Sequence, residues 1–473
     1  MRYETVIGLE IHAELLTNSK IFCSCGTSFG AEPNSQVCPV CTGMPGSLPV
    51  LNKQVVNLAI KAGLAFNCTI ANHLKFDRKN YFYPDLPKAY QISQYDIPLC
   101  KDGYVEIDID GKQKKIGISQ IHIEEDAGKL IHSEEGKTFV DFNRCGVGLI
   151  EIVTCPDIRS AQEAKLVFEE VKAILEVVNV SDCKMQEGSL RCDVNLSVRQ
   201  EGKKELGERT EIKNLNSFSS VAHAIKSESE RQIKLLENGE RVLRQTRRWD
   251  DLKNKNTLLR SKEILDDYRF FSEPDLPAIN IEKNLISEIN ALLPELPRAR
   301  KLRFMNDFDL PEFDAYLIAY TKFFSDFFEK VVLLGAEPKR ASSLLITDVQ
   351  KYIKEKKLLN IPIEPLKFAK LIDMIQNAEL SLRASKQVLE IMLETGGAPD
   401  DIAKEQGLIQ ESDEDVLLPV IQKVLQENQS AVADYKSGKE KAIGYIAGII
   451  MKETRGASNP KVINRILKEI LSK

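Results

Sequence analysis

Glu151 is the residue whose surroundings first suggest chemistry, because it is the only charged side chain in a strongly apolar stretch. Residues 147–154 read V-G-L-I-E-I-V-T, and apolar side chains occupy both faces of the strand that this pattern predicts. Burying a carboxylate in such a strand is unfavourable unless a cation or a hydrogen-bond donor meets it. We therefore expect Glu151 to have a charged or polar partner.

Other predicted strands also carry ionisable groups on one face, as the alternation of apolar and polar residues shows. These groups are, in chain order, Glu10 and His12 in residues 3–13, Glu124 and Glu125 at the end of residues 114–125, Asp193 in residues 190–199, and Glu211 with Lys213 in residues 210–215. If neighbouring strands of an antiparallel sheet brought them together, they would form an oxygen-rich pocket suited to Mg²⁺ or Mn²⁺, which in turn could hold the phosphates of a nucleotide. The alternative is a solvated polar face, since exposed carboxylates are common.

Two close cysteine pairs indicate a second kind of site. Cys23 and Cys25 are followed, after a glycine-containing segment, by Cys38 and Cys41. Four such thiols suit tetrahedral Zn²⁺, although C-x-C spacing is less usual than C-x2-C. The alternative is a set of reduced free thiols, as expected in a cytosolic protein. The other cysteines are scattered among apolar residues and are interpreted as small core residues.

Standard nucleotide-binding and hydrolase motifs are absent from the sequence. There is no G-x-x-x-x-G-K-[ST], and residues 146–151 have a glutamate where the dinucleotide pattern requires its third glycine. No G-x-S-x-G elbow is present either. If the protein uses ATP, it does so without a P-loop. The net charge of −5 gives no overall basic field for nucleic acid, although a local basic patch would suffice.

The chain divides into three parts by its patterns. Strand-like alternation dominates up to the proline-marked segment 292–297, and helical periodicity follows. A polar, acidic segment then precedes a small helical tail. We predict domains at 1–293, 294–405 and 406–473, in line with a length that suggests about three units.

Two further features concern the loops and the location of the protein. Residues 76–98 contain three prolines and four tyrosines, which predicts an ordered but irregular loop. The first ten residues carry charges where a signal peptide would be apolar, and no later segment approaches about 18 uncharged apolar residues. We therefore expect a cytoplasmic protein without a membrane span.

Six long blocks of this sequence resemble one known family. They are Y-E-T-V-I-G-L-E-I-H-A-E-L (3–15), C-P-V-C-T-G-M-P-G-S-L-P-V-L-N (38–52), K-N-Y-F-Y-P-D-L-P-K-A-Y-Q-I-S-Q-Y (79–95), I-H-I-E-E-D-A-G-K (121–129), D-F-N-R-C-G-V-G-L-I-E-I-V-T (141–154) and R-C-D-V-N-L-S-V-R (191–199). Together they closely resemble the B subunit of the bacterial aspartyl/glutamyl-tRNA amidotransferases, and the resemblance extends over essentially the whole chain.

The resemblance implies a fold and an activity. The implied fold is α+β: a cradle-shaped catalytic domain around an antiparallel sheet, similar in plan to glutamine synthetase, then an all-α helical domain and a small α-helical tail that binds tRNA. The implied activity is ATP-dependent transamidation of misacylated Glu-tRNA(Gln) or Asp-tRNA(Asn). The side-chain carboxylate is phosphorylated and then amidated with ammonia, which a partner amidase (glutaminase) subunit releases from glutamine. A small linker subunit completes a heterotrimer.

The resemblance also implies roles for individual residues. Its Mg²⁺ positions fall on His12, Glu125 and Glu151, with Glu10 and Asp193 beside them. Glu125, Glu151, Lys79 and Lys88 become catalytic candidates, the two lysines where ammonia would reach the site, and Asp193, Glu211 and Lys213 become nucleotide-binding candidates. Structural Zn²⁺ falls on Cys23, Cys25, Cys38 and Cys41.

Two other interpretations remain open at this point. One is a free-standing ligase that resembles glutamine synthetase and acts on a small carboxylate, which would not need the helical extension. The other is a non-catalytic tRNA-binding scaffold whose sheet carboxylates are structural. The sequence does not say whether glutamyl-tRNA, aspartyl-tRNA or both would be the substrate.

Overall fold

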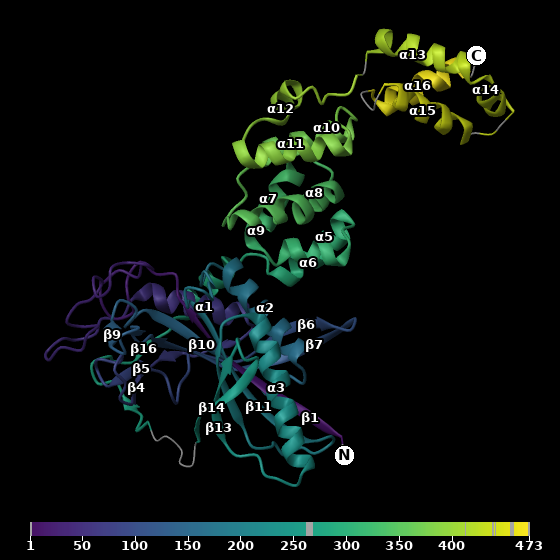
Figure 1. Cartoon of the computed structure of the whole chain (residues 1–473). Coiled ribbons are helices and arrows are strands. Elements are labelled where there is room, and N and C mark those ends of the chain that lie inside the picture. Colours follow the sequence, from purple (N-terminus) through teal and green to yellow (C-terminus); the bar gives the residue numbers. More distant parts are fainter. Residues whose placement is uncertain are drawn as a thin grey trace. The chain divides into compact units, whose positions relative to one another are not determined.

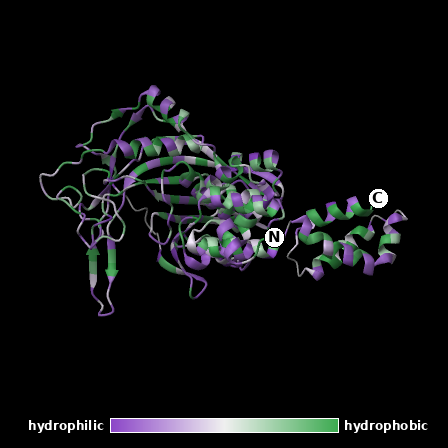
Figure 2. Cartoon of the chain, turned by 90° about the horizontal axis from the view of Figure 1, so that it is seen from above, coloured by the Kyte–Doolittle hydropathy of each residue, from purple (hydrophilic) through white to green (hydrophobic). Residues whose placement is uncertain are grey.

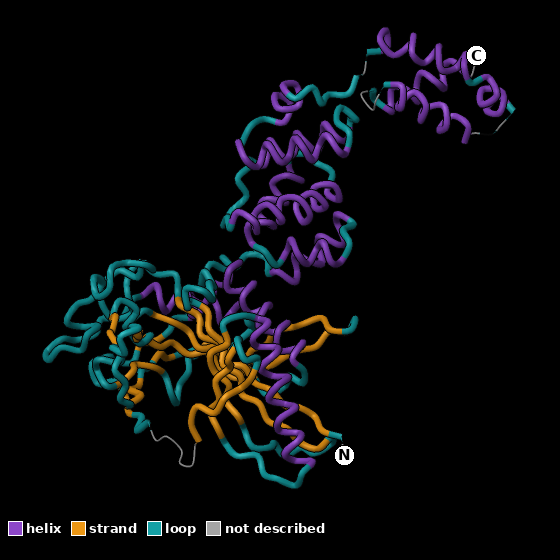
Figure 3. The backbone as a smooth tube through the Cα atoms, viewed as in Figure 1, coloured by secondary structure: helices purple, strands orange, loops and turns teal. Residues whose placement is uncertain are grey.

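The structure is a computed structural model, and it describes residues 2–261, 268–411, 413–437, 439, 441–454 and 458–471. The chain forms two compact units, residues 1–297 and 298–473 (Figure 1). The first unit is mixed α and β, and the second is helical (Figure 3). None of the described helices is long and apolar enough to cross a membrane.

A nine-stranded sheet forms the centre of the first unit, with the strand order β14-β13-β12-β11-β1-β10-β7-β6-β2. Its strands are β1 (Tyr3–Glu14), β2 (Thr69–Ile70), β6 (Cys100–Ile109), β7 (Lys112–Glu125), β10 (Gly148–Thr154), β11 (Leu190–Gln200), β12 (Thr210–Leu215), β13 (Gln245–Asp250) and β14 (Lys255–Ser261). Neighbours run antiparallel except β12 and β13, which are parallel. The predicted α+β class with a largely antiparallel sheet is thus confirmed at this level.

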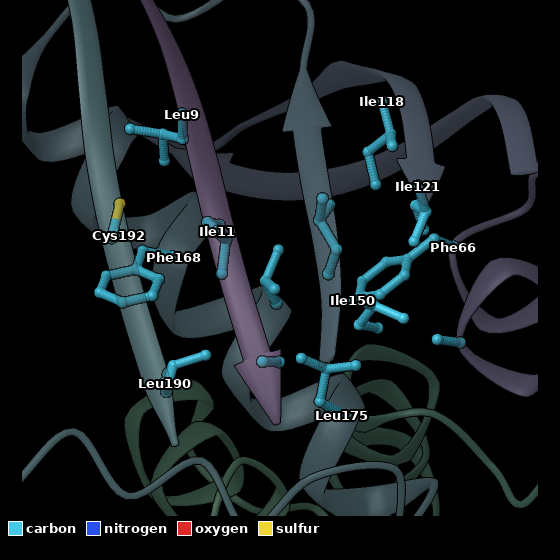
Figure 4. Close-up of a cluster of buried hydrophobic side chains, with 14 of the residues drawn as sticks. Leu9, Ile11, Phe66, Ile118, Ile121, Ile150, Phe168, Leu175, Leu190 and Cys192 are labelled. Atoms are coloured by element: carbon cyan, nitrogen blue, oxygen red, sulfur yellow. The ribbon is translucent and has the colours of Figure 1, made fainter. Parts of the chain in front are cut away.

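One face of the sheet packs against helices to form the hydrophobic core of the first unit. Because strand side chains alternate, Ile7, Leu9, Ile11 and Ala13 of β1 point to this face, and all four are fully buried. Helices α1 (Lys53–Ala65), α2 (Ala161–Val177) and α3 (Phe218–Glu237) contribute to the same cluster. Figure 4 shows Phe168 and Leu175 beside the strands that carry Ile11 and Ile150. Packing in the core holds the strands of the sheet in position. The polar side chains on the opposite face are therefore attached to a rigid backbone.

Helix α2 begins at a side-chain cap. Ser160 is the N-cap, and its side chain accepts a hydrogen bond from the Glu163 backbone amide at 3.1 Å. The Glu163 carboxylate accepts a hydrogen bond from the Arg159 amide at 2.7 Å. Both hydrogen bonds satisfy backbone N–H groups that have no partner within the helix, as in a capping box.

The predicted irregular loop at 76–98 contains regular structure, and this part of the prediction is wrong. Strand β4 (Asp77–Asn80) pairs with β5 (Tyr90–Ser93) and with β15 (Phe271–Ser272) in a small second sheet. The prolines that argued against regular structure, Pro84 and Pro87, lie in the connection between β4 and β5, where no ladder amide is needed. The remaining elements of the first unit are β3 (His73–Leu74), β8 (Lys129–His132), β9 (Thr138–Asp141), β16 (Ile279–Asn280) and α4 (Lys283–Ala291).

The second unit is built from short helices. They are α5 (Pro297–Phe308), α6 (Glu312–Ala319), α7 (Lys322–Leu333), α8 (Pro338–Leu344), the π-helix η1 (Leu345–Val349), α9 (Gln350–Lys356), α10 (Pro365–Gln376), α11 (Leu382–Thr395), α12 (Pro399–Glu405), α13 (Glu414–Glu427), α14 (Gln429–Lys436), α15 (Lys441–Glu453) and α16 (Pro460–Leu471). Hydrophobic and hydrophilic residues alternate along the helices near the C-terminus (Figure 2). The buried apolar residues form two separate clusters, one from residues 304–403 and one from residues 417–471.

Candidate active site

Strand register gathers ionisable side chains on the face of the nine-stranded sheet opposite the core. His12 on β1 lies opposite Glu151 on β10, and Glu151 lies opposite His122 on β7. On the other side of β1, Glu10 lies opposite Asp193 on β11. Residues directly opposite each other in a sheet point to the same face, so these five side chains share one surface.

His12, Glu124 and Glu151 form the first cluster on this face. Their ligand atoms lie within 4.8 Å of one another. The His12 Nε2 atom is 3.6 Å from Glu124 and 3.7 Å from Glu151, and the His122 Nε2 atom is 3.0 Å from Glu151. Two carboxylates and an imidazole at this spacing offer the oxygen and nitrogen ligands that Mg²⁺ or Mn²⁺ accepts.

Glu151 thus has the polar partners that its apolar strand requires. Burial by itself would raise the pKa of this carboxyl, but the neighbouring charges of His12, His122 and Lys79 outweigh burial and hold the pKa well below its usual value. The pKa of His122 is raised, since the charge and hydrogen bond of Glu151 outweigh its burial. Glu151 is therefore ionised at neutral pH.

Glu10, Asp193 and Glu211 form the second cluster, and their ligand atoms also lie within 4.8 Å of one another. The Lys213 ammonium donates a hydrogen bond to Asp193 and lies 2.8 Å from Glu211. These two carboxylates raise the pKa of Lys213 despite its burial. Burial and the charge of Glu151 raise the pKa of Glu10, whose Oε1 atom accepts a hydrogen bond from Asn195 at 2.7 Å.

The structure does not bring Glu125 together with His12 and Glu151. Glu125 lies one residue beyond Glu124 on β7, so its side chain points to the other face of the strand. Its Oε1 atom accepts hydrogen bonds from the buried Lys88 ammonium and from the Ile92 amide, the latter at 2.9 Å. Among the predicted acidic residues, Glu124 takes the place beside His12 that was expected for Glu125.

The two predicted lysines occupy different places. Lys88 forms an ion pair with Glu125 in which its side chain is 8% exposed and that of Glu125 is 2% exposed. Lys79, on β4, lies over the rings of Tyr81 and Tyr268, with its Nζ atom 5.8 and 5.1 Å from their centres. The charge of Lys79 contributes to the low pKa of Glu151, whereas Lys88 is paired with Glu125.

The four cysteines of the two pairs come together, with sulfur atoms within 4.8 Å of one another. The Sγ atoms of Cys38 and Cys41 are 3.9 Å apart. Zn–S bonds of about 2.3 Å in a tetrahedron place sulfurs about 3.8 Å apart, so this arrangement fits Zn²⁺. A hydrogen bond from Cys23 lowers the pKa of Cys41, and the ammonium of buried Lys20, 3.5 Å from the Cys41 sulfur, also contributes. A cavity of about 110 Å³ lies between Cys41 and the Lys88–Glu125 pair.

Sequence reasoning missed the two histidine partners as a pair. It singled out His12 but not His122, which makes the closest contact with Glu151. The signal was present in the segment I-H-I-E, because residues 122 and 124 must point to the same face of a strand. The same alternation would have preferred Glu124 to Glu125.

Comparison with known proteins shows which family models match this chain. The model of the GatB/GatE catalytic domain matches residues 5–287, and the model of the GatB domain matches residues 326–471. The chain is thus an amidotransferase subunit of the ligase type.

The relatives give the particular family. The B subunit of the aspartyl/glutamyl-tRNA(Asn/Gln) amidotransferase of Caldicellulosiruptor bescii is 53% identical over 480 residues, and that of Thermoanaerobacter pseudethanolicus is 54% identical over 475 residues. Each alignment covers 100% of both chains. This chain belongs to the family of B subunits of the aspartyl/glutamyl-tRNA(Asn/Gln) amidotransferases.

Proposed function

We propose that this chain catalyses the ATP-dependent transamidation of misacylated Glu-tRNA(Gln), Asp-tRNA(Asn) or both. The observation that carries the proposal is the pair of carboxylate clusters on one face of the sheet, His12–Glu124–Glu151 and Glu10–Asp193–Glu211. Phosphorylating a carboxylate with ATP brings several negative charges together. A surface that can hold two divalent cations side by side meets this requirement, and the family assignment makes the acceptor an aminoacyl-tRNA.

Within this proposal, the residues of the two clusters have different roles. Mg²⁺ bound there would offset the charges of the phosphates and of the substrate carboxylate. His12, Glu124 and Glu151 hold and orient the first cation site, while His122 and Lys79 keep Glu151 ionised. Asp193, Glu211 and Lys213 form the side of the site that faces the nucleotide phosphates, and Glu10 joins the two clusters.

Glu125 was expected to bind the metal ion. We propose a different role for it, together with Lys88. Both line the cavity of about 110 Å³ beside Cys41, on the opposite face of β7 from the cation cluster. A buried, hydrogen-bonded pair of this kind suits the polar route by which ammonia from the amidase subunit would reach the acyl phosphate. We assign structural Zn²⁺ to Cys23, Cys25, Cys38 and Cys41, next to that route.

The family assignment supports the other parts of the proposal without testing them. The protein works in the cytoplasm as a heterotrimer with an amidase subunit and a small linker subunit. The catalytic domain is the cradle of residues 1–293, followed by the helical domain 294–405 and the tRNA-binding tail 406–473. The two hydrophobic clusters of the second unit support this division of the helices.

A transamidation assay tests the function. The chain and its partner subunits receive glutamate-charged tRNA(Gln), ATP, Mg²⁺ and ammonium chloride, and conversion to the glutaminyl form is followed. We expect conversion by the wild type, a loss of at least about 100-fold in Glu124→Gln and Glu151→Gln variants, and no loss in the exposed control Glu135→Gln. Full conversion by both cluster variants would favour the non-catalytic scaffold, and conversion of free glutamate would favour the small-substrate ligase.

A further inference from the structure

Lys20 is a completely buried cationic side chain that the proposed function does not use. It follows β1 and precedes the first cysteine pair, and 0% of its surface is exposed. Removing an ammonium group from water is costly unless negative charge and hydrogen-bond acceptors surround it. The groups around Lys20 therefore show what compensates its charge.

Lys20 differs from other buried lysines in having no carboxylate partner. Lys88 is paired with Glu125, and its side chain is 8% exposed. Lys301 of the second unit has a side chain that is 5% exposed and is paired with Glu312 at 2.7 Å. Within the part of the chain that the structure describes, the Lys20 ammonium forms no such ion pair, and its two acceptors are a sulfur atom and a carbonyl oxygen. Its compensating negative charge must come from another kind of group.

The sulfur atom of Cys41 accepts two hydrogen bonds. The Lys20 Nζ atom donates one at 3.5 Å, and the backbone N–H of Cys38 donates the other at 3.2 Å. A neutral thiol is a weak acceptor, whereas a metal-bound sulfur is a thiolate with a negative charge. An ammonium and an amide that converge on one sulfur therefore fit a metal-bound thiolate better than a free thiol.

The charge of the proposed zinc centre is opposite to that of Lys20. Four thiolates carry more negative charge than Zn²⁺ offsets, so a centre made of Cys23, Cys25, Cys38 and Cys41 is negatively charged overall. Cys41 is the buried member of the four, and water screens charge least at a buried position. The Lys20 ammonium contacts this ligand and offsets part of the excess negative charge.

Lys20 also connects the cysteine group to the segment that leads into β10. Its ammonium donates its second hydrogen bond, at 3.3 Å, to the carbonyl oxygen of Phe142 in the connection between β9 and β10. In the same connection, the Cys145 thiol donates a hydrogen bond to the Cys41 carbonyl at 3.2 Å. Cys41 is thus attached to the first unit through both its side chain and its backbone.

We propose that Lys20 is a positioning residue for the zinc centre. Its ammonium offsets part of the negative charge of the four thiolates, and its hydrogen bond to the Cys41 sulfur holds that ligand in its orientation. Its hydrogen bond to the Phe142 carbonyl ties the same ligand to the connection before β10. This inference rests on the zinc assignment of the proposed function and adds the group that compensates the charge of the centre.

Competition for Zn²⁺ with a chromophoric chelator tests this role without relying on turnover. Lys20→Met keeps an unbranched apolar side chain and removes both the charge and the donor. Because loss of an outer partner of a metal ligand costs about 10- to 100-fold in affinity, Lys20→Met in the complete complex should bind Zn²⁺ at least about 10-fold more weakly than the wild type. The matched control is Lys301→Met, which removes a buried lysine from the second unit and should retain the zinc affinity of the wild type. Equal zinc affinity of Lys20→Met and the wild type would overturn the proposal.

Co²⁺ in place of Zn²⁺ reports on the sulfur ligand itself. A hydrogen bond stabilises the sulfur lone pair, so its loss makes the thiolate a stronger electron donor to the metal. We expect the sulfur-to-cobalt charge-transfer absorption of Lys20→Met to move to longer wavelength, and that of Lys301→Met to stay in place. An unchanged absorption in Lys20→Met would contradict a hydrogen bond from Lys20 to a metal-bound sulfur.

Thermal unfolding distinguishes this role from ordinary packing. In the zinc-loaded wild type, Lys20→Met should lower the unfolding midpoint by at least about 4 °C, because the negative charge of the centre stays buried without its partner. In the Cys38→Ser/Cys41→Ser background the same substitution should not lower the midpoint, since the charge that Lys20 compensates is absent. An equal loss in both backgrounds would assign Lys20 to packing alone and overturn the proposal. Wild-type protein that binds no zinc would overturn the zinc assignment itself, and this inference with it.

Discussion

Glu124 and Glu125 are adjacent in the sequence, yet their side chains lie on opposite faces of β7 and have different partners. Glu124 lies 3.6 Å from His12, and Glu125 is paired with Lys88. Two acidic residues in a row on a strand cannot both join the same cluster. Substitution of each should therefore give a different kind of defect.

The first prediction separates the two carboxylates by cation binding. Because Glu124 supplies an oxygen beside His12 and Glu151, Glu124→Gln should weaken Mn²⁺ binding at least about 10-fold. This is the lower end of the loss of affinity that follows mutation of residues around a metal site. Glu125→Gln should leave Mn²⁺ affinity close to that of the wild type. Titration followed by the electron paramagnetic resonance signal of free Mn²⁺ measures both, and the reverse pattern would contradict the assignment of the site.

The second prediction concerns the four cysteines. A Cys38→Ser/Cys41→Ser variant removes half of the proposed thiolate ligands, so the purified protein should lose bound zinc as measured by elemental mass spectrometry. Cys68→Ser, which changes a buried cysteine outside the group, should retain it. Retention of zinc by the double variant would show that the four sulfurs are not its ligands.

The third prediction concerns the buried Lys88–Glu125 pair. Lys88→Met leaves the Glu125 carboxylate buried without its cation, which should destabilise the first unit by roughly 3–5 kcal/mol. Lys137→Met removes a surface-exposed pair with Glu135 and should cost at most about 1 kcal/mol. Thermal unfolding followed by circular dichroism compares them. Adding Glu125→Gln to Lys88→Met should restore part of the loss, and if it does not, the pair is not the source of the defect.

The fourth prediction is a dependence of stability on pH. Burial, together with the nearby Asp126 charge, raises the pKa of Glu14 from 4.5 to about 8, although Arg191 and Arg144 oppose the shift. The folded protein therefore binds an extra proton at Glu14 between these pH values, and the contribution of Glu14 to the free energy of unfolding falls as pH rises through this range. We expect Glu14→Gln to reduce that fall by about 1–3 kcal/mol. Unfolding midpoints at pH 5, 6, 7 and 8 would show it, and identical slopes in both proteins would exclude Glu14 as the cause.

Much of the site was predictable because a strand places alternate residues on one face. Glu10, His12, Glu151 and Asp193 each follow from that rule, although only the strand order in space shows that they meet. The resemblance places Glu125 in the metal site, whereas the structure places Glu124 beside His12, as the alternation with His122 indicates. The parallel pairing of β12 with β13 could not be predicted, since sequence patterns do not distinguish strand direction.

The arrangement of the cysteine group could be predicted from the sequence, whereas the strands in segment 76–98 could not. Spacing alone brought Cys23, Cys25, Cys38 and Cys41 into one prediction, because short cysteine spacings limit how far apart the sulfurs can lie. The strands β4 and β5 were missed because each has only four residues and prolines lie between them. Short strands of this kind are defined by their pairing partners, which local sequence does not contain.

The hydrophobic core beneath the sheet has a consequence for motion. Backbone hydrogen bonds set the spacing of β7, β10, β1 and β11, and the packed core resists any change in it. The two carboxylate clusters therefore keep the same separation before and after substrate arrives, and little energy is spent on rearranging them. Any closure around a substrate must come from segments outside the nine-stranded sheet, such as the connection between β4 and β5.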